Sequence, residues 1–287
     1  MKRTARLREL INREEILLAP GAYDPLLAKC VEISGFDAVY MTGAGVSHST
    51  LGMPDLGLVT MTEMTDRAHK IADAVEIPVV ADCDNGYGNA INVMRAVKEF
   101  ERAGVAGIHI EDQIIPKRCG HFPNKQVISR EEMLGKLKAA LDARVDEDFV
   151  IIARTDARTA VGLEEAIERG QAYAEVGADV VFVESPRSEE ELRRIPGSIN
   201  RPLLANMVER GLTPLFSAPE LQEMGYSLVI FPGAVGRFLT KQVLEFLAVL
   251  KTEGTTESNL DRMCTFQEHN RLLGLERLEE LNKHYGG

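Results

Sequence analysis

Two aspartates one residue apart, Asp82 and Asp84, follow a short apolar run in VVADCDNGYGN. Because side chains alternate along a strand, both carboxylates are expected to point the same way at the strand end. Two carboxylates form a half-site for a hard divalent cation, and Mg²⁺ typically takes one or two and completes its shell with water or substrate oxygens. Oxygen donors favour Mg²⁺ or Mn²⁺ over zinc. A turn rich in Asp, Asn and Gly is the alternative interpretation.

A cysteine, Cys119, has basic neighbours in IIPKRCGHFPNK, namely Lys117, Arg118 and His121. Cationic neighbours lower the pKa of a thiol, so the Cys119 proton is expected to be transferable near neutral pH. Gly120 permits close approach of the backbone to a ligand. The segment reads as a loop suited to closing over a substrate. A surface loop with an incidental cysteine is the alternative.

Polar residues also follow other apolar runs. Arg154 ends one of them, where a guanidinium is able to clamp a carboxylate. A purely structural salt bridge with Glu184 or Asp156 is the alternative. Asn206, helped by Thr213, is expected either to hydrogen-bond a substrate carboxylate or to cap the next helix.

The elements that position these residues alternate along the chain. Continuous apolar runs that alternate with helical patterns predict a parallel sheet covered by helices. Eight such units predict a (β/α)₈ barrel, whose active site lies at the carboxyl ends of its strands. A doubly wound sheet is the alternative, but no GxGxxG follows the first run. The expected strands lie at 16–24, 38–43, 78–84, 107–113, 149–156, 180–185, 202–209 and 228–233, and helical patterns lie between them at 58–75, 91–104, 129–145 and 162–177.

Most of the expected strands end in polar residues, which supports an active site at the carboxyl ends of the strands. Glu111 follows one run and is expected to support a metal site indirectly, without binding the ion itself. Arg237 lies just past the last run, where barrels often bind anions.

Length and composition narrow the class of protein. The 287 residues are read as one barrel domain, 1–287, with a C-terminal helical extension over about 240–287. A formal net charge of −11 argues against a general nucleic-acid binder but not against an anionic small substrate. The four cysteines form no CxxC, and no apolar run has the length of a signal peptide or a membrane span. A cytoplasmic protein is the default expectation.

Seven segments together resemble the isocitrate lyase and phosphoenolpyruvate mutase superfamily. They are GAYD, MTGAG, LGMPDLGLVTMTEM, DCDNGYGN, IEDQIIPKRCGHFPNK, IIARTDA and LLANMVERG, in that order along most of the chain. The resemblance implies a (β/α)₈ barrel with a C-terminal helix swapped between subunits, in homodimers or homotetramers. It also implies a small carboxylate substrate and Mg²⁺ as cofactor. The acidic net charge and the lack of a membrane-spanning apolar run lead us to expect no nucleic-acid or membrane partner.

The resemblance also implies roles for residues at matching positions. By this match, the segment Thr42, Gly43 and Ala44 binds the oxo-acid part of the ligand. Asp82 and Asp84 hold Mg²⁺ with support from Glu111, and Cys119 is the general acid beside Gly120 and His121. The residues that contact substrate are Arg154, Glu184 and Asn206. Either Tyr40 or a carboxylate relay takes the first proton.

The implied reaction is carbon–carbon cleavage of a 2-hydroxy di- or tricarboxylate, of the 2-methylisocitrate or 2,3-dimethylmalate type, to a 2-oxo acid such as pyruvate. Signals for the substrate conflict. Arg237 suits an additional substrate carboxylate, whereas Phe266 stands where tricarboxylate lyases of the superfamily carry another arginine. Oxaloacetate decarboxylation or hydrolysis, phosphonomutase chemistry and a non-catalytic dicarboxylate-binding barrel are the alternatives.

Overall fold

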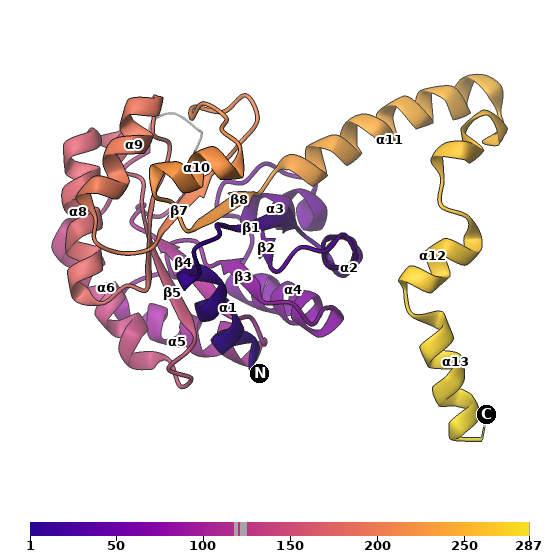
Figure 1. Cartoon of the computed structure of the whole chain (residues 1–287), viewed down its shortest axis with the longest axis horizontal. Coiled ribbons are helices and arrows are strands. Elements are labelled where there is room, and N and C mark those ends of the chain that lie inside the picture. Colours follow the sequence, from indigo (N-terminus) through magenta and orange to yellow (C-terminus); the bar gives the residue numbers. More distant parts are fainter. Residues whose placement is uncertain (118–119, 121–124, 287) are drawn as a thin grey trace. The chain divides into compact units, whose positions relative to one another are not determined.

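A computed structural model describes residues 1–117, 120 and 125–286, and its parallel strands close into a barrel in sequence order, β1 to β8 (Figure 1). The predicted (β/α)₈ barrel is confirmed, and the doubly wound alternative is wrong. The strands are β1 Leu17–Ala22, β2 Val39–Met41, β3 Val79–Asp82, β4 Gly107–Glu111, β5 Val150–Thr155, β6 Val180–Val183, β7 Leu203–Asn206 and β8 Leu228–Phe231.

Helices follow the strands and surround the barrel in Figure 1. Asn89 and Asn92 form a reciprocal cap at the start of α5, and this cap satisfies backbone N–H groups that the helix leaves free. In the barrel unit the helices are α1 Arg3–Asn12, α2 Pro25–Ile33, α3 Gly43–Leu51, α4 Met61–Ala74, α5 Ala90–Arg102, α6 Arg130–Ala143, α7 Ala157–Ala160, α8 Leu163–Val176, α9 Glu189–Ser198 and α10 Ala218–Met224.

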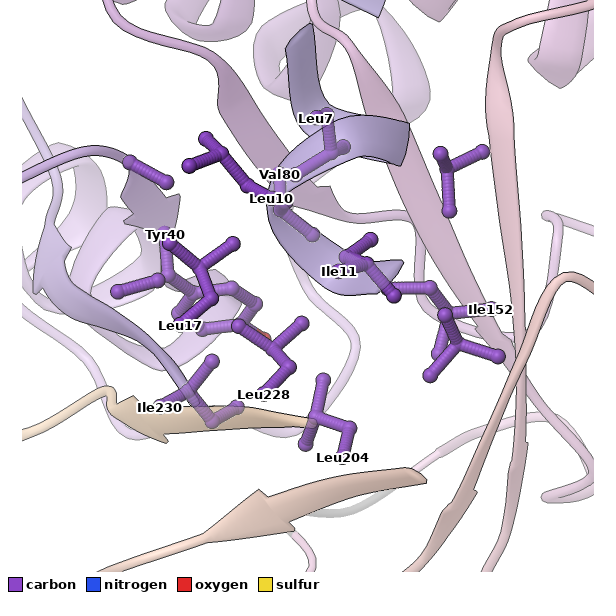
Figure 2. Close-up of a cluster of buried hydrophobic side chains, with 14 of the residues drawn as sticks. Leu7, Leu10, Ile11, Leu17, Tyr40, Val80, Ile152, Leu204, Leu228 and Ile230 are labelled. Carbon is purple, nitrogen blue, oxygen red and sulfur yellow. The ribbon is translucent and has the colours of Figure 1, made fainter. Parts of the chain in front are cut away.

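The barrel interior at the amino-terminal ends of the strands is filled with apolar side chains (Figure 2). Helix α1 contributes Leu7, Leu10 and Ile11, which pack with inward side chains of the strands and close this end. The strand residues of this cluster include Leu17, Tyr40, Val80, Ile152, Phe182, Leu204 and Leu228. Because this end is packed with hydrocarbon, polar chemistry is restricted to the carboxyl ends of the strands.

The chain divides into two compact units, Met1–Ala234 and Val235–Gly287. The second unit consists of most of α11 (Ala234–Glu253), the 3₁₀ helix η1 (Glu257–Arg262), α12 (Phe266–Leu272) and α13 (Leu275–His284). Its helices expose large apolar side chains, among them Phe238, Leu244 and Leu278. Within the described residues, no helix is both long and apolar enough to cross a membrane.

Candidate active site

Strand alternation places the polar strand-end residues in the next layer above the apolar core. Residues two apart on a strand share a face. Tyr40, Val80, Ile152, Phe182 and Leu204 lie in the core cluster. The residues two positions further along are Thr42, Asp82, Arg154, Glu184 and Asn206, and all except the half-buried Asn206 are buried. The side chains that face the barrel interior therefore change from apolar to polar from one layer to the next.

The paired aspartates meet at the end of β3. The backbone N–H of Asp84 donates to Asp82 Oδ1 at 2.9 Å, and Asp84 has a left-handed backbone with φ 47°. Burial raises the pKa of Asp84 to about 6, although Lys117 opposes the rise. The residues therefore form both the turn of the alternative interpretation and a close pair of buried carboxylates.

Two further residues surround this pair. A Cβ on Gly43 would collide with the Asp82 carboxylate, so only glycine leaves room there. Lys117 Nζ lies 2.6 Å from Asp84 Oδ1 and 2.7 Å from Asp55 Oδ1. Asp55 carried no signal in the sequence, because it is one acid in the loop GMPDLG.

The donor set suits Mg²⁺ better than a structural zinc ion. Among the described residues, no group of three or more His, Cys, Asp or Glu side chains is arranged to hold a metal. Mg²⁺ needs only one or two carboxylates, with water and substrate filling the other positions. The buried Glu111 Oε1 has no hydrogen-bond partner in the described part of the chain and is available to a bound water. The residues fit the expected cofactor.

Arg154 lies among three carboxylates. Its Nε is 2.9 Å from Asp156 Oδ2, its Nη1 is 3.1 Å from Glu111 Oε2, and its Nη2 is 3.6 Å from Glu184 Oε2. The guanidinium also lies over the Phe182 ring, 5.1 Å from its centroid. The internal salt bridges considered from the sequence are therefore present, and they hold the cation at the rim of the barrel.

Tyr40 reaches His109 across the barrel interior. Tyr40 Oη and His109 Nε2 are 2.7 Å apart, and the two rings stack with centroids 5.8 Å apart. Burial lowers the pKa of His109 to about 4, so the imidazole is neutral at pH 7. Burial, reinforced by Asp82, raises the pKa of Tyr40 well above its ordinary value. Tyr40 therefore keeps its proton and can donate it to the ring nitrogen.

Gly120 lies against the polar rim. A Cβ at Gly120 would collide with Arg154 Nη2 and with the Glu184 carboxylate. Its carbonyl oxygen accepts from Lys125 Nζ at 2.5 Å and from Ser185 Oγ at 3.2 Å. The close backbone approach expected of this glycine is present.

The other expected substrate contacts are placed as follows. Asn206 does not cap a helix: its Nδ2 donates to Glu184 Oε2 at 3.0 Å. Asn206 Oδ1 and the buried Thr213 Oγ1 have no hydrogen-bond partner in the part of the chain that is described. Thr42 Oγ1 accepts from the N–H of Gly45 at 3.3 Å and caps α3, which includes Gly43 and Ala44.

Several expectations lie outside this description. Cys119, Arg118 and His121 fall outside the described residues. Arg237 belongs to the second compact unit, so its place relative to the barrel rim is not defined. Sequence reasoning missed Asp55 and Lys125, whose partners are far away along the chain, and it took Lys117 only for a neighbour of the thiol.

The fold and the rim define a (β/α)₈-barrel protein with a carboxylate pair suited to a divalent cation. The family model described as phosphoenolpyruvate phosphomutase matches residues 7–250, and the chain belongs to this enzyme family.

Two curated relatives cover nearly the whole chain. It is 52% identical to a 2,3-dimethylmalate lyase of Eubacterium barkeri over 99% of both chains. It is 45% identical to a 2-methylisocitrate lyase of Aeropyrum pernix over 96% of this chain and 88% of the relative.

Two solved structures are also similar. An oxaloacetate acetylhydrolase bound to the inhibitor 3,3-difluorooxalacetate has a TM-score of 0.95 and 40% identity, over 100% of this chain and 98% of that one. A phosphonopyruvate hydrolase in complex with oxalate and Mg²⁺ has a TM-score of 0.90 and 30% identity, over 99% of both chains. The superfamily resemblance found in the sequence is confirmed.

Proposed function

We propose that this protein is a Mg²⁺-dependent carbon–carbon lyase that cleaves a 2-hydroxy di- or tricarboxylate to a 2-oxo acid, pyruvate in the first instance, and a second carboxylate. One observation supports this most strongly: the buried Asp82 and Asp84 pair lies at the same barrel rim as the Arg154 guanidinium. The named relatives include lyases for 2,3-dimethylmalate and 2-methylisocitrate.

In this proposal Asp82 and Asp84 hold Mg²⁺, with Glu111 supporting its water shell; Mn²⁺ is an acceptable substitute because the donors are oxygens. Mg²⁺ held by these carboxylates would supply Lewis acidity, which would lower the pKa of a substrate hydroxyl bound beside it. The start of α3 offers the backbone N–H groups of Gly43 and Ala44 to the oxo-acid carboxylate, beside Thr42, whose own N–H donates to the carbonyl of Ala22.

Arg154 and Asn206 bind the rest of the substrate, with Thr213 beside them and with Glu184 orienting Asn206. Gly120 brings the backbone of its segment against Arg154. Arg237 is assigned to an additional substrate carboxylate by the family resemblance alone.

Two proton transfers complete the reaction. Loss of the substrate hydroxyl proton breaks the carbon–carbon bond, and the electron pair of that bond remains on the departing fragment as a carboxylate-stabilised carbanion. Cys119 protonates that carbanion, with His121 beside it. Tyr40 and Glu111 are the two candidates for the first proton. Tyr40 would accept it while passing its own proton to His109 Nε2, 2.7 Å away.

The proposal extends to assembly. Helices α11 and α13 expose apolar side chains that include Phe238, Val243, Leu247 and Leu281. We propose that a second copy of the chain covers them, as in the swapped-helix homodimers and homotetramers that the resemblance implies, and that the protein acts on its small substrate in the cytoplasm.

The deciding experiment measures pyruvate release from racemic 2-methylisocitrate and from 2,3-dimethylmalate, with Mg²⁺ and with EDTA. Metal-dependent pyruvate from either supports the lyase, and the better substrate tells whether a di- or a tricarboxylate fits. No pyruvate from either substrate would refute it.

Oxaloacetate hydrolysis or decarboxylation is the second candidate, because a solved oxaloacetate acetylhydrolase is 40% identical with a TM-score of 0.95. Oxalate and acetate formed from oxaloacetate would identify the hydrolase, and CO₂ release above the Mg²⁺ background would identify the decarboxylase. A phosphorus–carbon product would identify phosphonomutase chemistry instead.

A further inference from the structure

A buried carboxylate that the proposed function does not use lies directly behind the site. Asp112 is fully buried just past the end of β4. Its Oδ1 accepts from the backbone N–H of Asp156 at 2.8 Å. Its Oδ2 accepts from Thr155 Oγ1 at 2.7 Å, Tyr173 Oη at 2.9 Å and Arg169 Nη1 at 3.0 Å.

Asp112 makes hydrogen bonds to two backbone groups at the end of β5. Its own N–H donates to the carbonyl of Arg154 at 3.2 Å, while its carboxylate accepts from the N–H of Asp156. The backbone from Arg154 to Asp156 is therefore held by one residue of the neighbouring strand end. The donors from Arg169 and Tyr173, both in α8, fix that carboxylate in turn.

Asp156 determines how the guanidinium is turned. It accepts from Arg154 Nε at 2.9 Å and from Nη2 at 3.2 Å, so one edge of the planar group is occupied. Lys125 Nζ, 2.5 Å from Asp156 Oδ1, fixes the same carboxylate from another side. The opposite edge also meets carboxylates, since Nη1 is 3.1 Å from Glu111 Oε2 and Nη2 is 3.6 Å from Glu184 Oε2. The proposed function assigns this edge, Nη1 with Nη2, to a ligand carboxylate, which a guanidinium can bind in two parallel hydrogen bonds.

We infer that Asp112 is a positioning residue: it fixes Asp156, and through Asp156 it fixes the orientation of the Arg154 guanidinium that is assigned to the substrate carboxylate. Asp112 touches neither substrate nor metal in this assignment. The inference rests on the proposed role of Arg154 as the carboxylate receptor. Tyr173 and Arg169 belong to the same hydrogen-bond network, because both donate to the Asp112 carboxylate.

The test uses binding, so that it does not depend on turnover. Asp112→Asn leaves Arg169 buried without its carboxylate and is prone to unfold, so Tyr173→Phe is the main variant, because it removes one donor and keeps the ring. Calorimetry measures oxalate binding in the presence of Mn²⁺, and electron paramagnetic resonance measures Mn²⁺ binding alone. Tyr226→Phe, at a buried tyrosine two residues before β8, is the matched control.

In the otherwise unaltered chain, we expect Tyr173→Phe to weaken oxalate binding about five- to tenfold while Mn²⁺ affinity changes less than about twofold, because the metal carboxylates are on β3. In an Arg154→Lys background, which cannot offer two parallel hydrogen bonds, the same substitution is expected to change oxalate binding less than about twofold. Tyr226→Phe is expected to change neither affinity.

Equal weakening in both backgrounds would overturn the inference and reduce Asp112 to a structural role. So would unchanged oxalate binding in Tyr173→Phe. Absence of oxalate binding to the Mn²⁺-loaded unaltered chain would overturn the role of Arg154 and the inference with it. Failure to release pyruvate, by contrast, would refute the lyase and leave the measured coupling to Arg154 standing.

Discussion

Lys117 Nζ lies 2.6 Å from Asp84 Oδ1, so the carboxylate assigned to the metal is also the partner of a buried ammonium group. Both groups are almost entirely shielded from water. A metal cation bound to Asp84 would therefore compete with the Lys117 ammonium group for the negative charge of the Asp84 carboxylate. This pairing makes metal affinity depend on a residue that is not itself a ligand.

Removing that ammonium group is expected to tighten metal binding. In Lys117→Met, the dissociation constant for Mn²⁺ should fall about three- to tenfold, because a competing positive charge leaves a site of low dielectric. Mn²⁺ titration followed by electron paramagnetic resonance measures it. Lys98→Met, at an exposed position of α5, is the control. Weaker binding in Lys117→Met would mean that the lysine orients Asp84 rather than competing for it.

Adding one methyl group at Gly43 is expected to damage the metal site. The new Cβ would collide with the Asp82 carboxylate, so Gly43→Ala should weaken Mn²⁺ binding at least about tenfold. Gly135→Ala is the matched control, because a Cβ at this position of α6 meets nothing within 4 Å. That control should keep its metal affinity and gain up to about 1 kcal/mol in helix stability. Normal Mn²⁺ binding by Gly43→Ala would contradict the assigned site.

The two candidates for the first proton make different predictions. Tyr40 has a raised pKa and bonds to His109, so Tyr40→Phe should lower kcat by about tenfold. Glu111 Oε1 is buried and has no hydrogen-bond partner among the described residues, so it is available to accept a proton, and Glu111→Gln should lower kcat about a thousandfold. Steady-state pyruvate release compares them, with Tyr226→Phe as control. The reverse ranking would assign the base to Tyr40.

Acid stability should depend on Asp156. Burial alone would raise the pKa of this carboxyl, but Arg154 and Lys125 outweigh burial and hold the pKa well below its usual value. A depressed folded pKa stabilises the protein above the unfolded value, about 3.9, and this contribution is lost as pH falls through the folded value.

Asp156→Asn removes this contribution and leaves two buried cations without their carboxylate, at a cost of about 3–5 kcal/mol near pH 7. The difference in unfolding free energy between the unaltered chain and the variant should shrink as pH falls below about 4. Urea unfolding at a series of pH values measures it. A difference that stays constant down to about pH 2 would count against the ion pairs.

Assembly should depend on the apolar side chains of α11. Val243 and Leu247, four residues apart on one face, are each 49% exposed. Changing both to Asp should convert an oligomer to a smaller species, because charges oppose burial of that face. Light scattering measures the mass, and Lys241→Asp, at an exposed position on another face of the same helix, is the control. An unchanged mass in the double variant would exclude this face from the interface.

The sequence by itself determined the barrel and most of its rim. Apolar runs that alternate with helical patterns leave few folds, and a polar residue at a strand end can be read directly because strands have a period of two. Asp82, Glu111, Arg154 and Asn206 were found in this way. The superfamily motifs were equally legible, because they are contiguous in the chain.

Only the tertiary structure decided which of these groups meet. Asp55 with Lys117, Tyr40 with His109, and Asp112 with Tyr173 are 62, 69 and 61 residues apart, and closure of the barrel brings each pair within hydrogen-bonding distance. A lone Asp or Tyr carries no sign of its partner, because burial and pairing depend on the three-dimensional path of the chain. The rim residues follow from local periodicity, whereas the pKa of each group and the direction of each donor follow from contacts that no local pattern encodes.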